Sequence, residues 1–233
     1  MNDLSILIPL YNEQEILIPN LRRILLFLER RGLNAEILLG SNGSDDSTVP
    51  IGTALQQENP GLIRFFHLEK RGCVGRIFKI ALEIASSPFL ITLDADLSVD
   101  LEFIPKALGV LQGHDIAVGS KQAGYQSRSV LRLLGSHLFI FCAQKLLGLE
   151  YDDYSIGAKG YRVEAAKMLA PGVSEDTNYV LDLLCKAQLK NLKIATVPID
   201  CADWRSSRFR LLREALIRFL HLFRLCIISF RKT

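Results

Sequence analysis

The chain has 233 residues, of which 49% are hydrophobic, and a formal net charge of +3. This composition supplies the core of one large domain, and the small net charge gives no indication of a nucleic-acid partner. Five scattered cysteines without zinc-site spacing, and a first strand that follows Met1 closely with no secretion signal, favour a reduced, cytoplasmic setting.

Segments typical of strands and helices alternate along the first half of the chain. We expect strands at residues 4–9, 35–39, 62–67, 88–93 and 115–119, and helices at residues 13–31, 48–58, 75–85 and 101–111. In the second half we expect helices at residues 130–147, 177–190 and 208–230, an extended segment at 154–161 and a strand at 193–199. The alternation predicts an α/β fold with a mainly parallel sheet.

Two carboxylates, Asp94 and Asp96, follow the fourth expected strand. Residues two apart in a strand face the same side, so we expect both carboxylates at one spot beyond the carboxyl end of the strand, where open α/β sheets bind ligands. Paired carboxylates suit Mg²⁺ or Mn²⁺, and such ions commonly bridge to phosphates. The alternative is an acidic turn without a ligand, because Asp is common in turns.

Three strand ends carry short polar signatures: Pro9-Leu10-Tyr11-Asn12-Glu13, Ser41-Asn42-Gly43-Ser44-Asp45-Asp46 and Asp94-Ala95-Asp96. With further matches at residues 119–121, 153–162, 197–199 and 205–208, they resemble the family 2 glycosyltransferases of the GT-A fold, in particular the dolichol- and polyprenyl-phosphate mannose or glucose synthases. The resemblance covers most of the chain.

The resemblance implies one GT-A domain over residues 1–233, a Rossmann-like three-layer sandwich around a mainly parallel sheet. Within it we expect a nucleotide-sugar-binding half at 1–120, an acceptor-side half at 121–205 and a C-terminal amphipathic helix at 206–233.

The resemblance also assigns donor-binding roles to the strand ends. Pro9, Tyr11 and Glu13 are expected to line the nucleoside pocket, where an aromatic ring packs against base or ribose and a carboxylate accepts hydrogen bonds. The other expected donor contacts are Ser41, Asn42, Gly72, Asp94 and Ala95. Taken alone, the first segment also fits a turn before a helix, with Asn12 as the N-cap.

For the metal, the resemblance makes Asp96 the direct ligand of Mg²⁺ or Mn²⁺ and places Asp94 on the ion or the nucleotide. The ion would neutralise the donor diphosphate and stabilise it as a leaving group. Relatives often have a further ligand where this chain has Ser98, which is a weaker donor.

The segment Glu175-Asp176-Thr177 resembles an element in which the Asp is the general base. The alternative is a helix N-terminus, where Asp and Thr are favoured as caps and by the helix dipole. An acceptor phosphate is already ionised near neutral pH and would need little help from a base.

Two groups of basic residues are expected around the phosphates. They are Lys121, Arg128 and Arg132 after the fifth strand, and Arg205 and Arg208 after the last one. Two such groups suit two anions, a donor diphosphate and an acceptor phosphate, and Arg205 joins Asp96 and Asp176 as an expected catalytic residue. The alternative for each is solvated surface charge.

Besides Ser98, the chain departs from the family pattern at two positions. Relatives usually carry Asp in place of Ser41, where it contacts the donor base, and many carry Lys in place of Cys73. Neighbouring cations at Lys70, Arg71 and Arg76 are available to compensate for the missing Lys. These departures leave the donor base open and motivate one alternative, a weak or inactive paralogue that binds a nucleotide sugar or a membrane partner.

The last expected helix repeats apolar residues at helical spacing, namely Leu212, Leu216, Phe219, Phe223, Ile227 and Phe230, with arginines on much of its other side. A basic amphipathic helix is typical of an anionic membrane interface, and the alternative is packing on the domain with the arginines in solvent. No uncharged apolar run approaches the ~18 residues of a membrane-spanning helix.

Taken with the family, these residues predict an inverting glycosyltransferase that moves a hexose from a GDP- or UDP-sugar to an acceptor, chiefly polyprenyl or dolichyl phosphate. We expect it in the cytoplasm, at the membrane face. A sugar-phosphate nucleotidyltransferase is the other enzyme class considered, but its first strand should lead into a Gly-rich loop, and here that strand leads into Tyr11-Asn12-Glu13.

Overall fold

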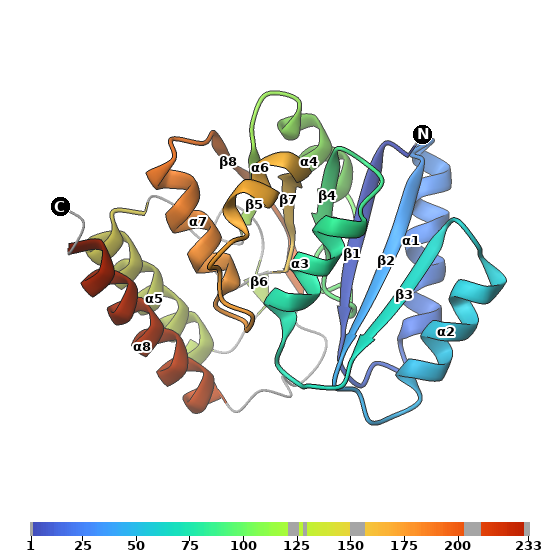
Figure 1. The fold of residues 1–233 in the computed structure, drawn as a ribbon, viewed down its shortest axis with the longest axis horizontal. Coiled ribbons are helices and arrows are strands. Elements are labelled where there is room, and N and C mark those ends of the chain that lie inside the picture. Colours follow the sequence, from blue (N-terminus) through green and yellow to red (C-terminus); the bar gives the residue numbers. More distant parts are fainter. Residues whose placement is uncertain (1, 121–125, 128–129, 150–156, 203–210, 231–233) are drawn as a thin grey trace.

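The computed structural model describes residues 2–120, 126–127, 130–149, 157–202 and 211–230, and Figure 1 shows their arrangement. The side chains of residues 126–127, 130–134, 136–137, 201–202, 211–216 and 228–230 are outside this description. Part of the expected extended segment at 154–161 therefore lies outside the described residues.

The centre of the molecule is a sheet of seven strands in the order β3-β2-β1-β4-β7-β5-β8. The strands are β1 Leu4–Leu10, β2 Ala35–Asn42, β3 Ile63–Leu68, β4 Phe89–Thr92, β5 Ile116–Ser120, β7 Lys159–Arg162 and β8 Ile194–Pro198. All neighbours pair in parallel except β7, which is antiparallel to both β4 and β5. The predicted mainly parallel sheet is confirmed. Two short strands, β6 Gln126–Ser127 and β9 Cys201–Ala202, pair separately.

Helices cover both faces of the sheet and give three layers. One core lies under α1 Leu17–Arg31, α2 Thr48–Glu58 and α4 Phe103–Leu111. The other lies under α3 Val74–Ile84, α5 Val130–Leu147, α6 Val163–Leu169, α7 Tyr179–Leu189 and α8 Leu211–Phe230. In β2, Ile37 and Leu39 enter the first core and Leu38 the second. Because the central strands are buried on both faces, they read as continuous apolar runs.

Most described boundaries lie within two residues of the sequence prediction; the end of β2 and the start of α1 differ by more, and α6 was not predicted. β2 continues to Asn42, because Gly40, Ser41 and Asn42 stay paired in register with β3. A Cβ at Gly40 would lie 2.5 Å from the Ile77 side chain, so the close approach of α3 favours glycine there. α1 begins four residues later than expected. The backbone of Asn12 is left-handed, with φ of 54°, and Glu13 then opens a turn by accepting the Leu17 N–H at 2.9 Å.

The helices α5 and α8 lie side by side at one end of the molecule, next to α7 (Figure 1). The rings of Phe139 and Phe219 meet edge to face with centroids 5.4 Å apart. Further along, the Cys226 thiol contacts the Leu146 carbonyl at 3.8 Å. The two helices therefore run in the same direction.

A buried carboxylate connects α8 to α7. Asp182 Oδ1 is 2.6 Å from His221 Nε2, and its Oδ2 accepts the Ser174 N–H at 2.7 Å and the Ser174 hydroxyl at 2.6 Å. Burial alone would raise the pKa of Asp182, but the hydrogen bonds from His221 and Ser174 outweigh it and lower the pKa below its ordinary value. The ionised form therefore contributes to folding.

We predict that Asp182→Asn destabilises the protein by about 1–3 kcal/mol at pH 7, because buried donors lose a charged acceptor. The stabilisation by the carboxylate is fully present above the unfolded-state pKa, near 3.8, and is lost as pH falls through the lower folded-state pKa. Urea unfolding at several pH values should thus show the difference shrinking below that pH. Glu164→Gln, at an exposed position of α6, is the control. A difference that does not change with pH would contradict this account.

Candidate active site

The loops after β1 and β2 are interlocked by one asparagine. The Asn12 N–H donates to Ser44 Oγ at 3.1 Å, and its side-chain Oδ1 accepts the Asp45 N–H at 2.9 Å. Nearby, the Glu13 N–H donates to Thr48 Oγ1 at 2.8 Å. The alternative in which Asn12 is the N-cap of α1 is wrong, because the N-cap is Ile16. Asn12 instead joins two loops at the carboxyl edge of the sheet.

A third loop, after β3, packs onto the same edge. The Arg71 guanidinium lies over the Tyr11 ring, 4.1 Å from its centroid. Asn42 bridges the loops, because its Nδ2 donates to the Leu10 carbonyl at 2.9 Å and its Oδ1 accepts the Gly72 N–H at 3.0 Å. These contacts hold Asn42 and Gly72 close to the segment that carries Tyr11. The Tyr11 ring and the Arg71 guanidinium form a planar stack there.

Ser41 is fully buried at the end of β2. Its hydroxyl donates to Ser44 Oγ at 2.9 Å and lies 3.1 Å from Nδ1 of His67 on β3. Ser41, which was predicted to contact the nucleotide-sugar donor, thus has no surface exposed to a ligand. Sequence analysis missed His67, because only the pairing of β2 with β3 shows that it stands level with Ser41.

The two candidate metal ligands lie in a turn after β4, which ends at Thr92. The expectation that strand alternation aligns them was wrong, because Asp94 and Asp96 lie beyond the strand and the turn passes through a left-handed Leu97 with φ of 49°. The Asn20 side chain, from α1, donates to the Ala95 carbonyl at 2.8 Å and holds the turn.

Each carboxylate has its own local contact. Asp94 Oδ2 accepts the Gly157 N–H at 3.2 Å, and Asp96 Oδ1 accepts the Ser98 N–H at 3.0 Å. Both residues remain partly exposed. A Cβ on Gly157 would lie 2.1 Å from Asp94 Oδ1, so a larger residue here would have to displace the Asp94 carboxylate.

Two further ionisable residues flank this turn and were not predicted. Tyr179, at the start of α7, is buried, and burial together with the nearby Asp94 charge raises the pKa of its hydroxyl well above the ordinary value. Lys159 is fully buried on β7, opposite Thr92. Both come from elements that follow β4 by more than sixty residues, so sequence distance concealed them.

Asp176 precedes α7 and is exposed. Its Oδ1 accepts the Asn178 N–H at 2.8 Å and its carbonyl accepts the Tyr179 N–H at 3.3 Å, which are the contacts of a helix N-terminus. The preceding segment packs on α3, because the Glu175 carbonyl accepts the Arg76 N–H at 3.1 Å and a Cβ on Gly75 would lie 2.3 Å from the Ser174 carbonyl. The catalytic role of Asp176 stays a prediction.

The side chains of the expected basic residues are not among those that the structure describes. Lys121, Arg128, Arg205 and Arg208 lie outside the described residues, and Arg132 lies in α5 with its side chain outside them. Pro9 and Glu13 are described and partly exposed, beside Tyr11.

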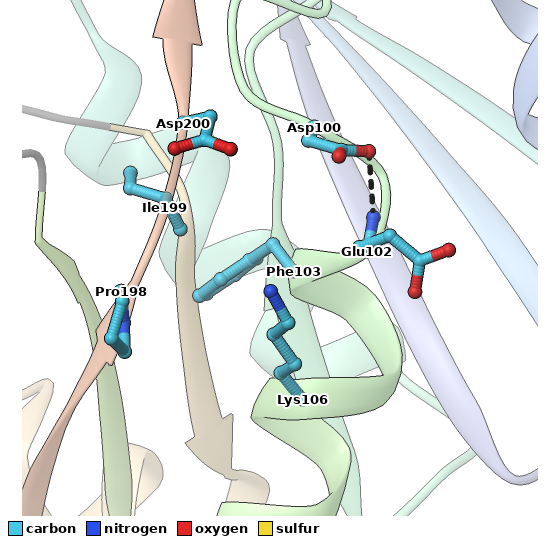
Figure 2. Close-up of a pocket in the computed structure, with 7 residues that line it drawn as sticks. All are labelled: Asp100, Glu102, Phe103, Lys106, Pro198, Ile199 and Asp200. Carbon is cyan, nitrogen blue, oxygen red and sulfur yellow. Dashed lines mark hydrogen bonds between the residues drawn. The ribbon is translucent and has the colours of Figure 1, made fainter. Parts of the chain in front are cut away.

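A separate cavity of about 90 Å³ opens where β8 ends beside α4 (Figure 2). It is lined by Asp100, Glu102, Phe103, Lys106, Pro198, Ile199 and Asp200. Its volume is below the roughly 300–1,000 Å³ of small-molecule sites, and no predicted site residue lines it. The candidate site is therefore the loop cluster around Tyr11, Asp94 and Asp96.

The model of the glycosyl transferase family 2 matches residues 5–169. The chain belongs to this family. Among curated proteins it is similar to the undecaprenyl-phosphate 4-deoxy-4-formamido-L-arabinose transferases of Aeromonas hydrophila subsp. hydrophila (32% identity over 160 residues) and Salmonella paratyphi B (31% over 159). Each match covers 68% of this chain and 48% of the relative, so the chain spans about half the length of these relatives.

The fold is that of solved GT-A glycosyltransferases, as predicted. Glucosyl-3-phosphoglycerate synthase from Mycobacterium tuberculosis, in complex with Mn²⁺, uridine diphosphate and glucosyl-3-phosphoglycerate, superposes with a TM-score of 0.67 at 18% identity. The match covers 95% of this chain and 80% of the synthase.

We predict that Gly157→Ala destabilises the protein by about 1–3 kcal/mol, because the new methyl group must displace the Asp94 carboxylate and break its bond to the backbone. Gly109→Ala is the matched control, because a Cβ there meets nothing within 4 Å. Urea unfolding measures both. Equal stability of the two variants would show that the β7 approach does not constrain Asp94.

Proposed function

We propose that this chain is an inverting glycosyltransferase that transfers a hexose from a GDP- or UDP-sugar to a polyprenyl phosphate. The observation that carries the proposal is the convergence of the Tyr11–Arg71 stack and the Asp94–Asp96 turn at one edge of the sheet. Planar groups suit a nucleoside base, and paired carboxylates suit a metal-bound diphosphate. Family membership and the names of the curated relatives, which are undecaprenyl-phosphate transferases of an arabinose derivative, support sugar transfer to a polyprenyl phosphate.

The donor set fits Mg²⁺ or Mn²⁺. Among the described residues no group of three or more His, Cys, Asp or Glu side chains could enclose an ion, and Asp96 with Asp94 would hold one only together with phosphate oxygens and water, which is the usual arrangement for Mg²⁺. Bound there, the ion would neutralise charge on the departing diphosphate. The M. tuberculosis synthase was crystallised with Mn²⁺ and with Mg²⁺.

In the proposed reaction an ionised phosphate oxygen of the acceptor attacks the anomeric carbon. The bond from that carbon to the donor diphosphate breaks, the nucleoside diphosphate leaves and the configuration inverts. No proton has to leave the attacking oxygen, so the reaction does not require Asp176 as a base. This agrees with the exposed position of Asp176 and its bond to the backbone. Arg205, Arg208, Lys121, Arg128 and Arg132 are proposed to bind the phosphates.

The alternative is a weak or inactive paralogue that binds a nucleotide sugar without turnover. The complete burial of Ser41 and the presence of Cys73 in place of a cation motivate it. Release of nucleoside diphosphate from GDP- and UDP-hexoses in the presence of membrane lipid extract separates the two, because the paralogue would bind the donor without releasing it.

We predict that Asp96→Asn lowers transfer about a hundredfold or more, because the isosteric amide keeps the fold but removes the charge that holds the ion. The measurement is nucleoside diphosphate release with lipid extract and Mn²⁺. Glu83→Gln, at an exposed position of α3, is the control for loss of an acidic charge. Turnover near the wild-type rate would remove Asp96 from the metal site.

We propose that the α5–α8 face docks on a membrane that carries the acceptor. Large hydrophobic side chains exposed on these helices are Leu138, Phe141, Ile217, Leu220, Phe223 and Ile227, whereas those exposed elsewhere in the described part are Ile18, Leu26, Met168 and Leu189. Arg224 and Lys145 are exposed on the same helices. Apolar groups with basic neighbours suit an anionic lipid interface. None of the described helices is both long and apolar enough to cross a bilayer.

The amphipathic pattern is only partly as predicted. Phe219 packs against α5, but Phe223 and Ile227 face outward, while Arg218 and His221 are partly buried. Between Ile217 and Ile227, where the side chains of α8 are described, its outward side is thus mainly apolar, which favours an interfacial role over a packed helix with a charged solvent face.

We predict that replacing Phe223 and Ile227 together by Ser weakens binding to phosphatidylglycerol vesicles at least tenfold, since each large apolar side chain contributes about 1.5–3 kcal/mol when buried. Vesicle sedimentation measures the binding. Leu26→Ser on α1, which removes a similarly exposed leucine far from α8 in sequence, is the control. Equal effects of the two changes would contradict docking through α8.

A further inference from the structure

We infer that Asn20 on α1 is a positioning residue for the acidic turn after β4. Its side-chain amide fixes the backbone of that turn, and through it the affinity of Asp94 and Asp96 for a divalent ion that is bound together with a nucleoside diphosphate. This inference rests on the proposed function. It adds a residue that acts through the Ala95 carbonyl and not by contact with the ion.

Asn20 is a polar residue beside the apolar side of α1. Leu17, Leu21 and Ile24 on that side are buried in the first core. Asn20 stands three residues after Leu17 and four before Ile24, so it is their neighbour on the helix surface. Its side chain is partly buried. An amide in such a place needs a hydrogen-bond partner, and the turn after β4 supplies one.

The Asn20 amide bonds to the residue that separates the two carboxylates. Its Nδ2 donates to the Ala95 carbonyl at 2.8 Å. A carbonyl oxygen can only accept a hydrogen bond, so the amide nitrogen must be the atom that faces it. Asp94 and Asp96 are the chain neighbours of Ala95. The amide therefore holds the backbone from which both carboxylates extend.

The turn needs this restraint because its backbone is strained. The Leu97 N–H closes the turn by donating to the Asp94 carbonyl at 3.1 Å. Leu97 has a left-handed φ of 49°, which residues other than glycine rarely adopt. Such a conformation persists only where surrounding contacts hold it. The burial of the Leu97 side chain in the first core is one such contact, and the Asn20 bond is another.

The two carboxylates depend on the turn to different extents. Asp94 Oδ2 accepts the Gly157 N–H at 3.2 Å, from the segment that leads into β7. Asp96 Oδ1 accepts the Ser98 N–H at 3.0 Å, from a residue only two positions further along the chain. Asp96 therefore moves with the turn, whereas Asp94 is also held from outside it. Loss of the Asn20 bond should displace Asp96, the expected direct ligand, relative to Asp94.

The same helix connects the acidic turn to the loop that carries Tyr11. The Glu13 carbonyl accepts the Leu17 N–H at 2.9 Å at the entry to α1, and the Asn20 N–H donates to the Ile16 carbonyl at 3.0 Å. Asn20 is thus joined to that loop by consecutive helical hydrogen bonds. Its amide fixes the acidic turn relative to the Tyr11 loop, as a nucleoside diphosphate in contact with both would require.

The test is calorimetric titration of the full chain with UDP and with GDP, each in Mn²⁺ and in EDTA. We expect Mn²⁺ to strengthen binding of at least one nucleotide to the wild type, because carboxylates and phosphate oxygens hold such an ion together. Asn20→Leu keeps the side-chain size but removes the donor. Its affinity in Mn²⁺ should fall about 10- to 100-fold, as is usual when a group that orients metal ligands is lost. Its affinity in EDTA should not change.

Two further variants separate positioning of the turn from a general loss of structure. Asn20→Gln, which keeps a donor amide, should recover part of the affinity in Mn²⁺. Asn59→Leu is the matched control, because it removes a similar bond from the Asn59 amide to the Leu55 carbonyl, 3.0 Å long, at the end of α2. It should leave both affinities unchanged. Urea unfolding establishes that each variant is folded under the conditions of the titration.

Several results would overturn the inference. Unchanged affinity of Asn20→Leu in Mn²⁺ would show that the amide does not position the turn. An equal loss in Mn²⁺ and in EDTA would assign Asn20 a structural role only. Nucleotide binding to the wild type that Mn²⁺ does not strengthen would overturn the inference but leave sugar transfer intact. Absence of binding by either nucleotide would overturn the proposed function as well.

Discussion

The pairing of β4 with β1, instead of with β3, which precedes it in the chain, brings the two halves of the candidate site together. The chain crosses the sheet through α3 to make this pairing, so the loops after β1, β2 and β3 and the acidic turn after β4 share one edge. Parallel neighbours end at the same edge. A stacking group such as Tyr11 and a carboxylate such as Asp96 can therefore serve one ligand.

The loops at this edge are ordered by bonds to one another and not by secondary structure. Asn12, Asn42 and Ser44 each bridge segments about thirty residues apart, and backbone groups that a loop would leave to water are paired. Such cross-linking fixes the loops before a ligand arrives, which reduces the entropy lost on binding. The same bonding keeps the Ser41 hydroxyl away from the surface, whereas its neighbours Ser44 and His67 are partly exposed.

The second core joins the candidate site to the α5–α8 face. Asp182 accepts hydrogen bonds from Ser174, beside the start of α3, and pairs with His221 on α8. The Glu175 carbonyl in the same segment accepts the Arg76 N–H. The helices with the exposed apolar side chains are thus anchored to the segment that precedes Asp176. In the proposed reaction, a lipid-borne acceptor and a nucleotide donor would meet across this segment.

The sequence by itself determined the alternating elements, the parallel sheet, the GT-A family and the carboxylates at the end of β4, because these depend on local periodicity and on short motifs. It misplaced the start of α1, where a left-handed Asn12 overrides helical preference. Only the tertiary structure decided that Gly157 must be small beside Asp94, that Ser41 is buried behind His67, and that Phe223 and Ile227 face outward. Each of these depends on contacts between residues far apart in the chain or on which side of a helix is covered, and the residues near each position in sequence do not record them.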